Sequence, residues 1–337
     1  MTITKTYFGT TGDAEVYLYT LTNDLGYEVS IINYGGAVTA LKTPDRAGVF
    51  GDIVLGYETL DDYVRYPRYF GALIGRHANR IADGRFILNG VQYQLGRNNG
   101  ANHLHGGFNG FDKRVWSAAE DGNVLRLSYL SKDGEESYPG NLEAFGDYRL
   151  LDNELSIEYR AATDKETIVN LTNHSYFNLK GAGTILDHEL TLNADSFTPV
   201  SSDLIPTGEI KSVTATPMDF RAGKKIGSEL ELAGGYDHNF VLNDWAGSLK
   251  TAARLYEATT GRVLEILTTE PGIQFYSGNF LDGSLVGKKG VAYEKYAGLC
   301  LEPQHFPDAP NHPNFPSTVL RPGEEYRHTT IFRFLSE

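Results

Sequence analysis

Apolar and polar residues alternate with a period of two in many short segments of this 337-residue chain, and this alternation restricts the fold more than any other feature. In residues 154–160, for example, Leu155, Ile157 and Tyr159 are separated by polar residues. Successive side chains of a β-strand point to opposite faces of a sheet, so such a segment buries one face and exposes the other. Further strand-like segments lie at 125–129, 190–192 and 330–335.

Tight turns connect these segments. Asn89-Gly90 separates the apolar run at 86–88 from the alternating residues 91–95. Asn-Gly is a strong hairpin signal, because both residues tolerate the positive φ angles of a tight turn. Gly is abundant, with 37 residues, and helical periodicity is limited to short candidates at 60–66 and 226–232. The sequence therefore predicts an all-β fold, a large antiparallel β-sandwich.

No linker divides the chain. No Ser- or Pro-rich stretch separates two regions of different composition, and no repeat period is visible. Because β-sandwiches and barrels often exceed the usual domain size, residues 1–337 are expected to form a single domain. Residues 302–316 contain five of the 13 prolines. Since proline fixes φ, this segment is expected to be a stiff, irregular loop.

The charge balance and the cysteine content exclude several classes of protein. Lys and Arg total 30 against 43 Asp and Glu, a formal net charge of −13, which argues against nucleic acid or an anionic membrane surface as a partner. The single cysteine, Cys300, rules out an intramolecular disulfide and a zinc site built from several cysteines. The first residues lack the apolar core of a signal peptide, and no window approaches 18 apolar residues. A cytoplasmic protein without a membrane span is therefore expected.

Four segments place polar side chains among apolar or glycine neighbours. The first is Gly75-Arg-His-Ala-Asn-Arg-Ile81, in which Asn79 and Arg80 offer several hydrogen-bond donors. A surface turn with a solvated arginine fits the same residues, and on spacing alone it is the favoured interpretation.

The second segment is Asn102-His-Leu-His-Gly-Gly107. On a strand, His103 and His105 would point the same way, as in a cupin-like metal site. Such a site needs a glutamate a few residues further on, whereas the nearest downstream carboxylate is Asp112. A hydrogen-bonding histidine beside a glycine turn is therefore favoured over a metal ligand.

The third segment, residues 170–179, is expected to be a strand and contains His174 among five uncharged polar residues. Burying such groups without partners is costly, so they either satisfy one another or line a polar pocket. In the fourth segment, 298–305, Glu302 ends an apolar run. A carboxylate at such a strand end is a candidate for a raised pKa and base chemistry, although on this evidence alone an ordinary strand-end glutamate is the favoured interpretation.

Two shorter segments add a carboxylate and an amide. Asp237 lies in residues 234–240, and Gln274 lies in residues 271–279. Taken alone, each segment indicates a polar turn. Taken with the four segments above, these side chains form the set expected of a sugar site, with amides, carboxylates and imidazoles for hydroxyl groups and aromatic faces for C–H patches. The sequence has no P-loop, no Rossmann fingerprint and no Gly-x-Ser-x-Gly elbow.

Six strings in this order closely resemble the aldose 1-epimerase (galactose mutarotase) family, over roughly residues 20 to 335. They are Gly-Arg-x-Ala-Asn-Arg-Ile at 75–81, Leu-His-Gly-Gly at 104–107, Thr-Asn-His-Ser-Tyr-Phe-Asn-Leu at 172–179, Gly-Tyr-Asp-His at 235–238, Pro-Gly-Ile-Gln-Phe-Tyr at 271–276 and Leu-Glu-Pro-Gln at 301–304. The resemblance implies a β-sandwich of the galactose mutarotase type, with no metal and no organic cofactor. It implies that a free monosaccharide such as D-galactose or D-glucose is converted between its α and β anomers.

The resemblance also implies roles by position. Glu302 resembles the general base and His174 the general acid. His105 resembles a second histidine near the ring oxygen. The remaining positions resemble substrate-binding residues, namely Asn79, Arg80, Asp237 and Gln274. Position 77 varies in the family, so no role is carried onto His77, and none is assigned to His103.

Other functions share parts of this pattern. A glycosidase would use Asp237 and Glu302 as its two carboxylates, but the histidine strings argue against it. A hexose-6-phosphate 1-epimerase would need an additional basic cluster, which is not seen near the motifs. A non-catalytic sugar-binding protein of the same fold would be expected to lack Glu302 or His174. A monomer or a homodimer is expected, and the preferred aldose is not predicted.

Overall fold

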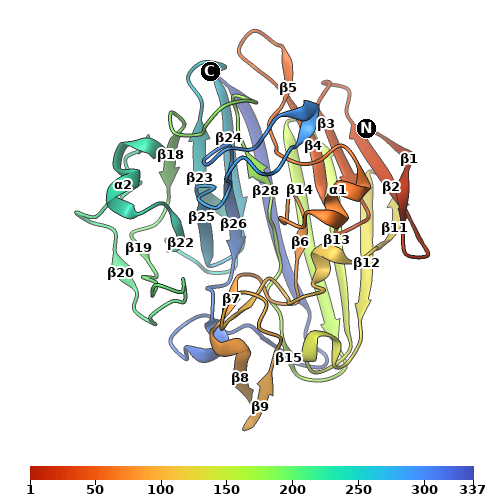
Figure 1. The fold of residues 1–337 in the computed structure, drawn as a ribbon, viewed down its shortest axis with the longest axis vertical. Coiled ribbons are helices and arrows are strands. Elements are labelled where there is room, and N and C mark those ends of the chain that lie inside the picture. The colour runs from red at the N-terminus through yellow and green to blue at the C-terminus, as the bar shows by residue number, and fades with distance from the viewer.

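Antiparallel strands in three large sheets form the framework of the molecule, and this computed structural model describes all 337 residues (Figure 1). The nine-stranded sheet has the spatial order β11 (Ser117–Asp121), β12 (Val124–Ser131), β13 (Leu142–Leu151), β14 (Glu154–Thr163), β28 (Tyr326–Ser336), β24 (Arg262–Thr268), β23 (Lys250–Tyr256), β18 (Glu189–Leu192) and β21 (Lys224–Lys225). The six-stranded sheet has the order β17 (Tyr176–Phe177), β26 (Leu299–Gln304), β25 (Gly272–Tyr276), β22 (Asp237–Val241), β19 (Ser196–Phe197) and β20 (Lys211–Ser212). The five-stranded sheet runs in chain order through β1 (Thr2–Thr11), β2 (Ala14–Thr22), β3 (Glu28–Ile32), β4 (Val38–Pro44) and β5 (Phe50–Asp52).

Smaller elements connect and cover these sheets. Four two-stranded ladders pair β6 (Leu73–Ile74) with β16 (Thr172–Asn173), β7 (Arg80–Ile81) with β10 (His103–Leu104), β8 (Arg85–Leu88) with β9 (Val91–Gln94), and β15 (Thr167–Ile168) with β27 (Val319–Leu320). The two α-helices are α1 (Leu60–Arg65) and α2 (Leu230–Ala233). Short 3-10 turns lie at Ala82–Gly84, Phe111–Lys113, Glu135–Ser137, Ile226–Glu229, Lys288–Gly290 and Ala309–Asn311. Neither α-helix has the length and apolar character needed to cross a bilayer.

The alternation read from the sequence corresponds to strands with one buried face. In β14, Leu155 and Ile157 are buried and pair with Phe332 and Thr330 of β28, whereas the intervening side chains are more exposed. The predicted hairpin is β8–β9, and Asn89 and Gly90 turn it with φ angles of 50° and 74°. These observations confirm the all-β prediction.

The predicted strand over 170–179 is wrong, because polar side chains interrupt it. Asn173 donates its side-chain amide to the Gly71 carbonyl and accepts the backbone N–H of Ser175. Such local bonds compete with a continuous ladder. The segment therefore divides into β16, which pairs with β6, and β17, which pairs with β26.

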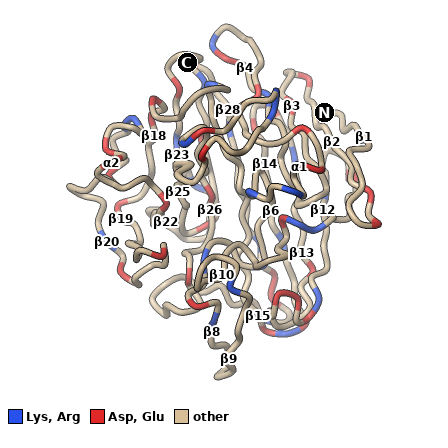
Figure 2. Tube along the Cα trace, viewed as in Figure 1, with Lys and Arg blue, Asp and Glu red and all other residues tan.

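One hydrophobic core contains buried side chains from all three large sheets, for example Ile31, Ile157 and Phe275. Charged residues lie mainly on loops and outer strands, with both signs interspersed (Figure 2). The six-stranded sheet contributes only one of its faces to this core, since Leu299 and Leu301 belong to the core cluster whereas the alternate residues of β26 do not. The opposite face is available for a site.

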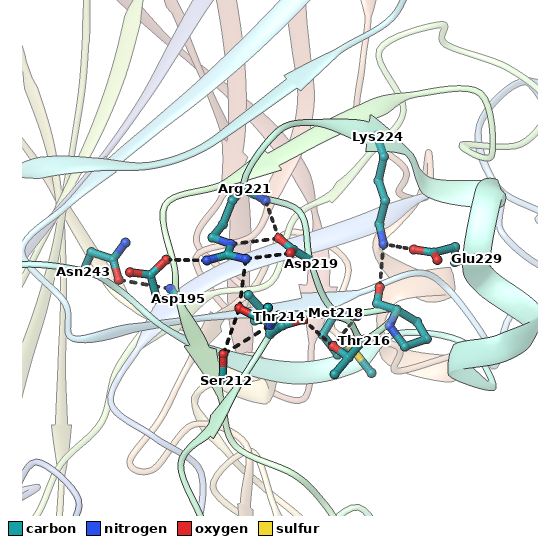
Figure 3. A network of polar contacts seen from close by, with 12 residues as sticks. Asp195, Ser212, Thr214, Thr216, Met218, Asp219, Arg221, Lys224, Glu229 and Asn243 are labelled. Atoms are coloured by element: carbon teal, nitrogen blue, oxygen red, sulfur yellow. Dashed lines mark hydrogen bonds and ion pairs between the residues drawn. The ribbon is translucent and has the colours of Figure 1, made fainter.

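A network of polar contacts connects parts of the segment 193–229, which joins β18 to α2 beside the six-stranded sheet (Figure 3). Arg221 donates to Asp219 at 2.7 Å and to Asp195 at 3.2 Å. Lys224 donates to the Pro217 carbonyl at 2.7 Å and forms an ion pair with Glu229. These bonds stabilise the segment that contains the turn at 201–204. This turn reaches the cavity described next.

Candidate active site

Two rows of residues on the free face of the six-stranded sheet form the floor of the site. Gln274 pairs with Glu302 on one side and with Asn239 on the other. In the adjacent row, Tyr276 pairs with Cys300 and with Asp237 in the same way. The rows place these side chains on one face, since directly opposed residues in a sheet point the same way. The β22 and β25 segments are strands here, so the prediction of polar turns is wrong for both.

A cavity of about 570 Å³ lies over this floor. Six of the seven site residues predicted from the sequence line it: Asn79, Arg80, His105, His174, Asp237 and Glu302. The seventh, Gln274, lies beside the cavity and donates its side-chain amide to Asp237 at 2.7 Å. Five separate stretches of the chain therefore converge on one space of the size of a small-molecule site.

Glu302 lies inside β26, and the prediction that it ends a strand and begins the proline loop is wrong. The ladder continues past it, because Pro303 and Gln304 still pair with β25. Only 1% of Glu302 is exposed to solvent. Burial raises the pKa of this carboxyl well above its usual range, Asp237 raises it further, and Arg80 opposes the shift. The raised pKa agrees with the prediction.

His174 lines the cavity beside Glu302, with its Nε2 atom 3.7 Å from the Glu302 Oε1 atom. Its ring stacks with those of Tyr69 and Tyr176, with centroid distances of 5.6 and 5.1 Å and interplanar angles near 30°. The Nδ1 atom on the other side of the ring is 3.4 Å from the sulfur of Cys300. Burial lowers the pKa of His174 to about 4. The two tyrosine rings therefore help to hold the imidazole in place, and burial disfavours its protonated form.

His105 approaches from the loop after β10, with a centroid distance of 5.1 Å to His174. Its Nδ1 atom accepts the backbone N–H of Asn79 at 3.1 Å. Because Nδ1 is the acceptor, the proton of the neutral ring resides on Nε2. Burial, followed by the nearby His174, lowers the pKa of His105 well below its ordinary value.

Four non-glycine residues around the cavity have left-handed backbone conformations, with φ angles of 62° at Tyr69, 59° at Asn79, 50° at His105 and 61° at Leu204. Positive φ is unfavourable for side chains with a Cβ and is often retained at functional sites. At His105 this conformation ends β10 and turns the side chain away from the direction of His103.

Arg80 and Asp237 form the polar side of the cavity. The Arg80 Nη1 atom is 3.8 Å from the Asp237 Oδ2 atom, and Arg80 Nε donates to Asn99 at 3.1 Å. With Gln274 bonded to its other oxygen, Asp237 is held by an arginine and an amide. Carboxylate, guanidinium and amide groups in fixed positions are suited to sugar hydroxyls. The interpretation of Arg80 as a solvated surface residue is wrong, since only 7% of it is exposed.

The two histidines without a predicted role lie elsewhere. His103 donates from Nδ1 to the Gly96 carbonyl, and its Nε2 accepts from Tyr138, both at 2.7 Å. With both ring nitrogens engaged, His103 is not a metal ligand in a pair with His105, in agreement with the favoured hydrogen-bonding interpretation. His77 is fully buried, and neither of its ring nitrogens has a hydrogen-bond partner in the protein.

Several cavity residues were not identified from the sequence. Tyr69, Arg68 and Phe280 line the cavity, as does Leu204 in the turn at 201–204. Tyr69 also contacts the His105 ring, with a centroid distance of 4.6 Å. Tyr69 and Phe280 follow no motif spacing that separates them from the other aromatic residues of the chain. Their adjacency to the cavity depends on the fold.

Two groups of side chains have the spacing of metal ligands. The donor atoms of His105, His174 and Glu302 lie within 4.8 Å of one another. A second group, Glu270, His305 and His328, is engaged in internal bonds, with His305 Nδ1 2.7 Å from Glu270. The absence of a metal requirement stays a prediction from the sequence.

Comparisons with known proteins agree with this geometry. The model of a family described as aldose 1-epimerase matches residues 17–333. A galactose mutarotase from Bos taurus is 48% identical over 340 residues, which cover 99% of each chain.

Two solved structures have the same fold. An aldose epimerase homologue from C. elegans superposes with a TM-score of 0.89 and 34% identity, over 95% of this chain and 98% of the other. A galactose 1-epimerase from Lactobacillus acidophilus NCFM gives a TM-score of 0.86 and 29% identity, over 99% of both chains.

Proposed function

Because this chain belongs to the aldose 1-epimerase family, we propose that it interconverts the α and β anomers of a free aldose. The relatives named galactose mutarotase make D-galactose the first substrate to test, with D-glucose as the second. The observation that carries the proposal is the distance of 3.7 Å between His174 Nε2 and Glu302 Oε1 in a buried cavity of sugar size.

The chemistry needs two groups at two oxygens of one carbon. A pyranose opens when the anomeric hydroxyl loses a proton and the ring oxygen gains one. In this proposal Glu302 accepts the proton from the anomeric hydroxyl, and His174 donates a proton to the ring oxygen. After rotation about the C1–C2 bond, the reverse transfers close the ring on the other face. Each well-placed acid or base contributes about 10² to 10⁴ in rate.

The proton count of the pair fits this cycle. Burial disfavours the charged form of both groups, so Glu302 and His174, 3.7 Å apart, are placed to share one proton. Before ring opening, His174 is protonated and Glu302 is ionised. After ring opening, His174 is neutral and Glu302 is protonated. Ring closure restores the first arrangement. The two charge arrangements of one shared proton are the two ends of the half-reaction, so no net proton is taken up.

The other predicted residues would orient the sugar. Asp237, held by Arg80 and Gln274, can accept from hydroxyl groups, and Arg80 can donate to them. His105 presents an Nε2–H donor beside His174. Tyr69 and Phe280 provide apolar ring surface at the cavity.

Polarimetry tests the proposal. Freshly dissolved α-D-galactose and α-D-glucose are followed separately, with the protein, with its Glu302→Gln variant and with a metal chelator. We expect faster approach to the same equilibrium rotation, loss of the acceleration in Glu302→Gln, and no effect of the chelator. No acceleration with either sugar would overturn the proposed substrate class, and a rate that falls with the chelator would contradict the metal-free mechanism.

A further inference from the structure

The two histidines of the cavity have different partners at the Nδ1 atom, and this difference decides what each Nε2 atom can do. Nδ1 of His105 faces a backbone N–H, that of Asn79. A backbone N–H only donates, so neutral His105 must carry its proton on Nε2. His105 can therefore donate at Nε2, but it has no lone pair there to take a proton back.

His174 has a different partner. Its Nδ1 atom is 3.4 Å from the Cys300 sulfur, within hydrogen-bond reach for sulfur, and both residues are buried. A thiol is a weak donor and a weak acceptor, so it permits a proton on Nδ1. Cys300 is two residues before Glu302 on β26, so both side chains project from the same face of the strand. The imidazole thus bridges Cys300 on one side and Glu302 on the other.

We propose that Cys300 is a positioning residue that accepts the Nδ1–H of His174 and thereby leaves Nε2 free to exchange a proton with the sugar. This inference rests on the proposed function, in which His174 both gives a proton to the ring oxygen and takes one back. After donation from Nε2, the ring must keep its remaining proton on Nδ1, and Nδ1–H then needs an acceptor. The Cys300 sulfur is the side-chain group within reach of Nδ1, and a hydrogen bond of the ring to the backbone of His174 itself also favours a protonated ring nitrogen.

A neutral acceptor also suits the acid role. A carboxylate in the place of Cys300 would stabilise the imidazolium and make His174 a weaker acid, as the aspartate does for the histidine of a serine protease triad. Burial raises the pKa of Cys300 well above its ordinary value, so the sulfur stays an uncharged thiol. The contact therefore orients the ring without adding a negative charge beside it.

The experiment is ¹⁵N NMR of the histidine rings in the full chain, combined with the kcat and KM of anomer exchange. Spectra of His174→Asn and His105→Asn assign the two rings. In the wild type we expect neutral His174 to carry its proton on Nδ1 and neutral His105 to carry it on Nε2. In Cys300→Ala we expect a mixture of His174 tautomers and a kcat about three- to tenfold lower with little change in KM, the size expected for one lost hydrogen bond.

Two variants control this experiment. Cys300→Ser keeps an acceptor and is expected to retain more of the kcat than Cys300→Ala. Leu301→Val removes a methylene group from the opposite face of the same strand and is expected to leave the His174 tautomer and kcat unchanged. Neutral His174 with its proton on Nε2 in the wild type, or a Cys300→Ala variant with unchanged tautomer and kcat, would overturn the inference. An active Glu302→Gln variant would instead count against the proposed base and leave the tautomer measurement readable.

Discussion

At the residue scale, burial controls the protonation of the cavity. Glu302 and His174 are both removed from water, and burial disfavours the charged form of each. The same principle applied to Cys300 keeps the thiol protonated. Burial therefore favours the neutral form of both the acid and the base, which suits reversible proton transfer to a neutral sugar.

Glu302→Gln is expected to lower kcat by at least about 10²-fold, because an amide cannot accept the proton of the anomeric hydroxyl. Its free energy of unfolding should fall little, since the amide has nearly the same size as the buried carboxyl and carries no charge to bury. Urea unfolding and polarimetry on one preparation check both parts. A variant that kept most of the rate would remove Glu302 from the base role.

The dependence of kcat/KM on pH should be a broad bell. As pH falls through about 4, the pKa of His174, both groups become protonated and the base is lost. As pH rises through the raised pKa of Glu302, both groups become deprotonated and the acid is lost. We therefore expect a plateau that extends well below pH 6. An acid limb at the ordinary histidine pKa would show that His174 is not held in the buried state described here.

At the scale of the elements, the sequence pattern predicted which segments are strands better than where they end. The alternation in β14 and the Asn-Gly turn of the β8–β9 hairpin are local signals, and both were predicted. The division of 170–179 into β16 and β17 depends on the Asn173 side chain reaching Gly71, 102 residues away along the chain. Contacts between distant segments leave no periodic mark in the sequence, and the positions of Tyr69 and Cys300 were missed for the same reason.

Asp237 lies at the start of β22, opposite Tyr276, and we propose that it binds the substrate rather than transferring a proton. Asp237→Ala is expected to raise KM by about tenfold or more with a smaller effect on kcat, because a hydrogen bond to a charged group is lost in both ground and transition states. Initial rates over a range of galactose concentrations check this. A fall confined to kcat would assign Asp237 to the chemical step.

At the scale of the whole molecule, site residues from β7, β22 and β26, which are far apart in the sequence, meet at one cavity. The single domain stays a prediction. Six ordered sequence strings indicated the candidate site residues, and the structure adds their relative positions. The expected monomer or homodimer and the expected cytoplasmic location stay predictions.

Overall stability should depend on pH partly through His77. Burial lowers its pKa to about 3 from an ordinary value of 6.5, so the unfolded chain binds a proton between these values and the folded chain does not. This contribution is fully present above pH 6.5 and decreases as pH falls towards 3. The resulting loss of unfolding free energy between pH 7 and pH 5 is about 2 kcal/mol.

His77→Leu removes that titration and should reduce the loss of unfolding free energy between pH 7 and pH 5 by about this amount. Urea unfolding of both proteins at the two pH values measures it. Equal pH dependence in the two proteins would mean that His77 titrates in the folded protein as it does in the unfolded chain.

The most direct test of the account is a crystal structure of the Glu302→Gln variant with bound D-galactose. The account predicts one sugar in the cavity, with its anomeric hydroxyl within about 3 Å of the side chain at position 302 and its ring oxygen at a similar distance from His174 Nε2. A sugar bound with its anomeric carbon away from both residues would contradict the proposed acid and base, whatever the kinetics of the variants.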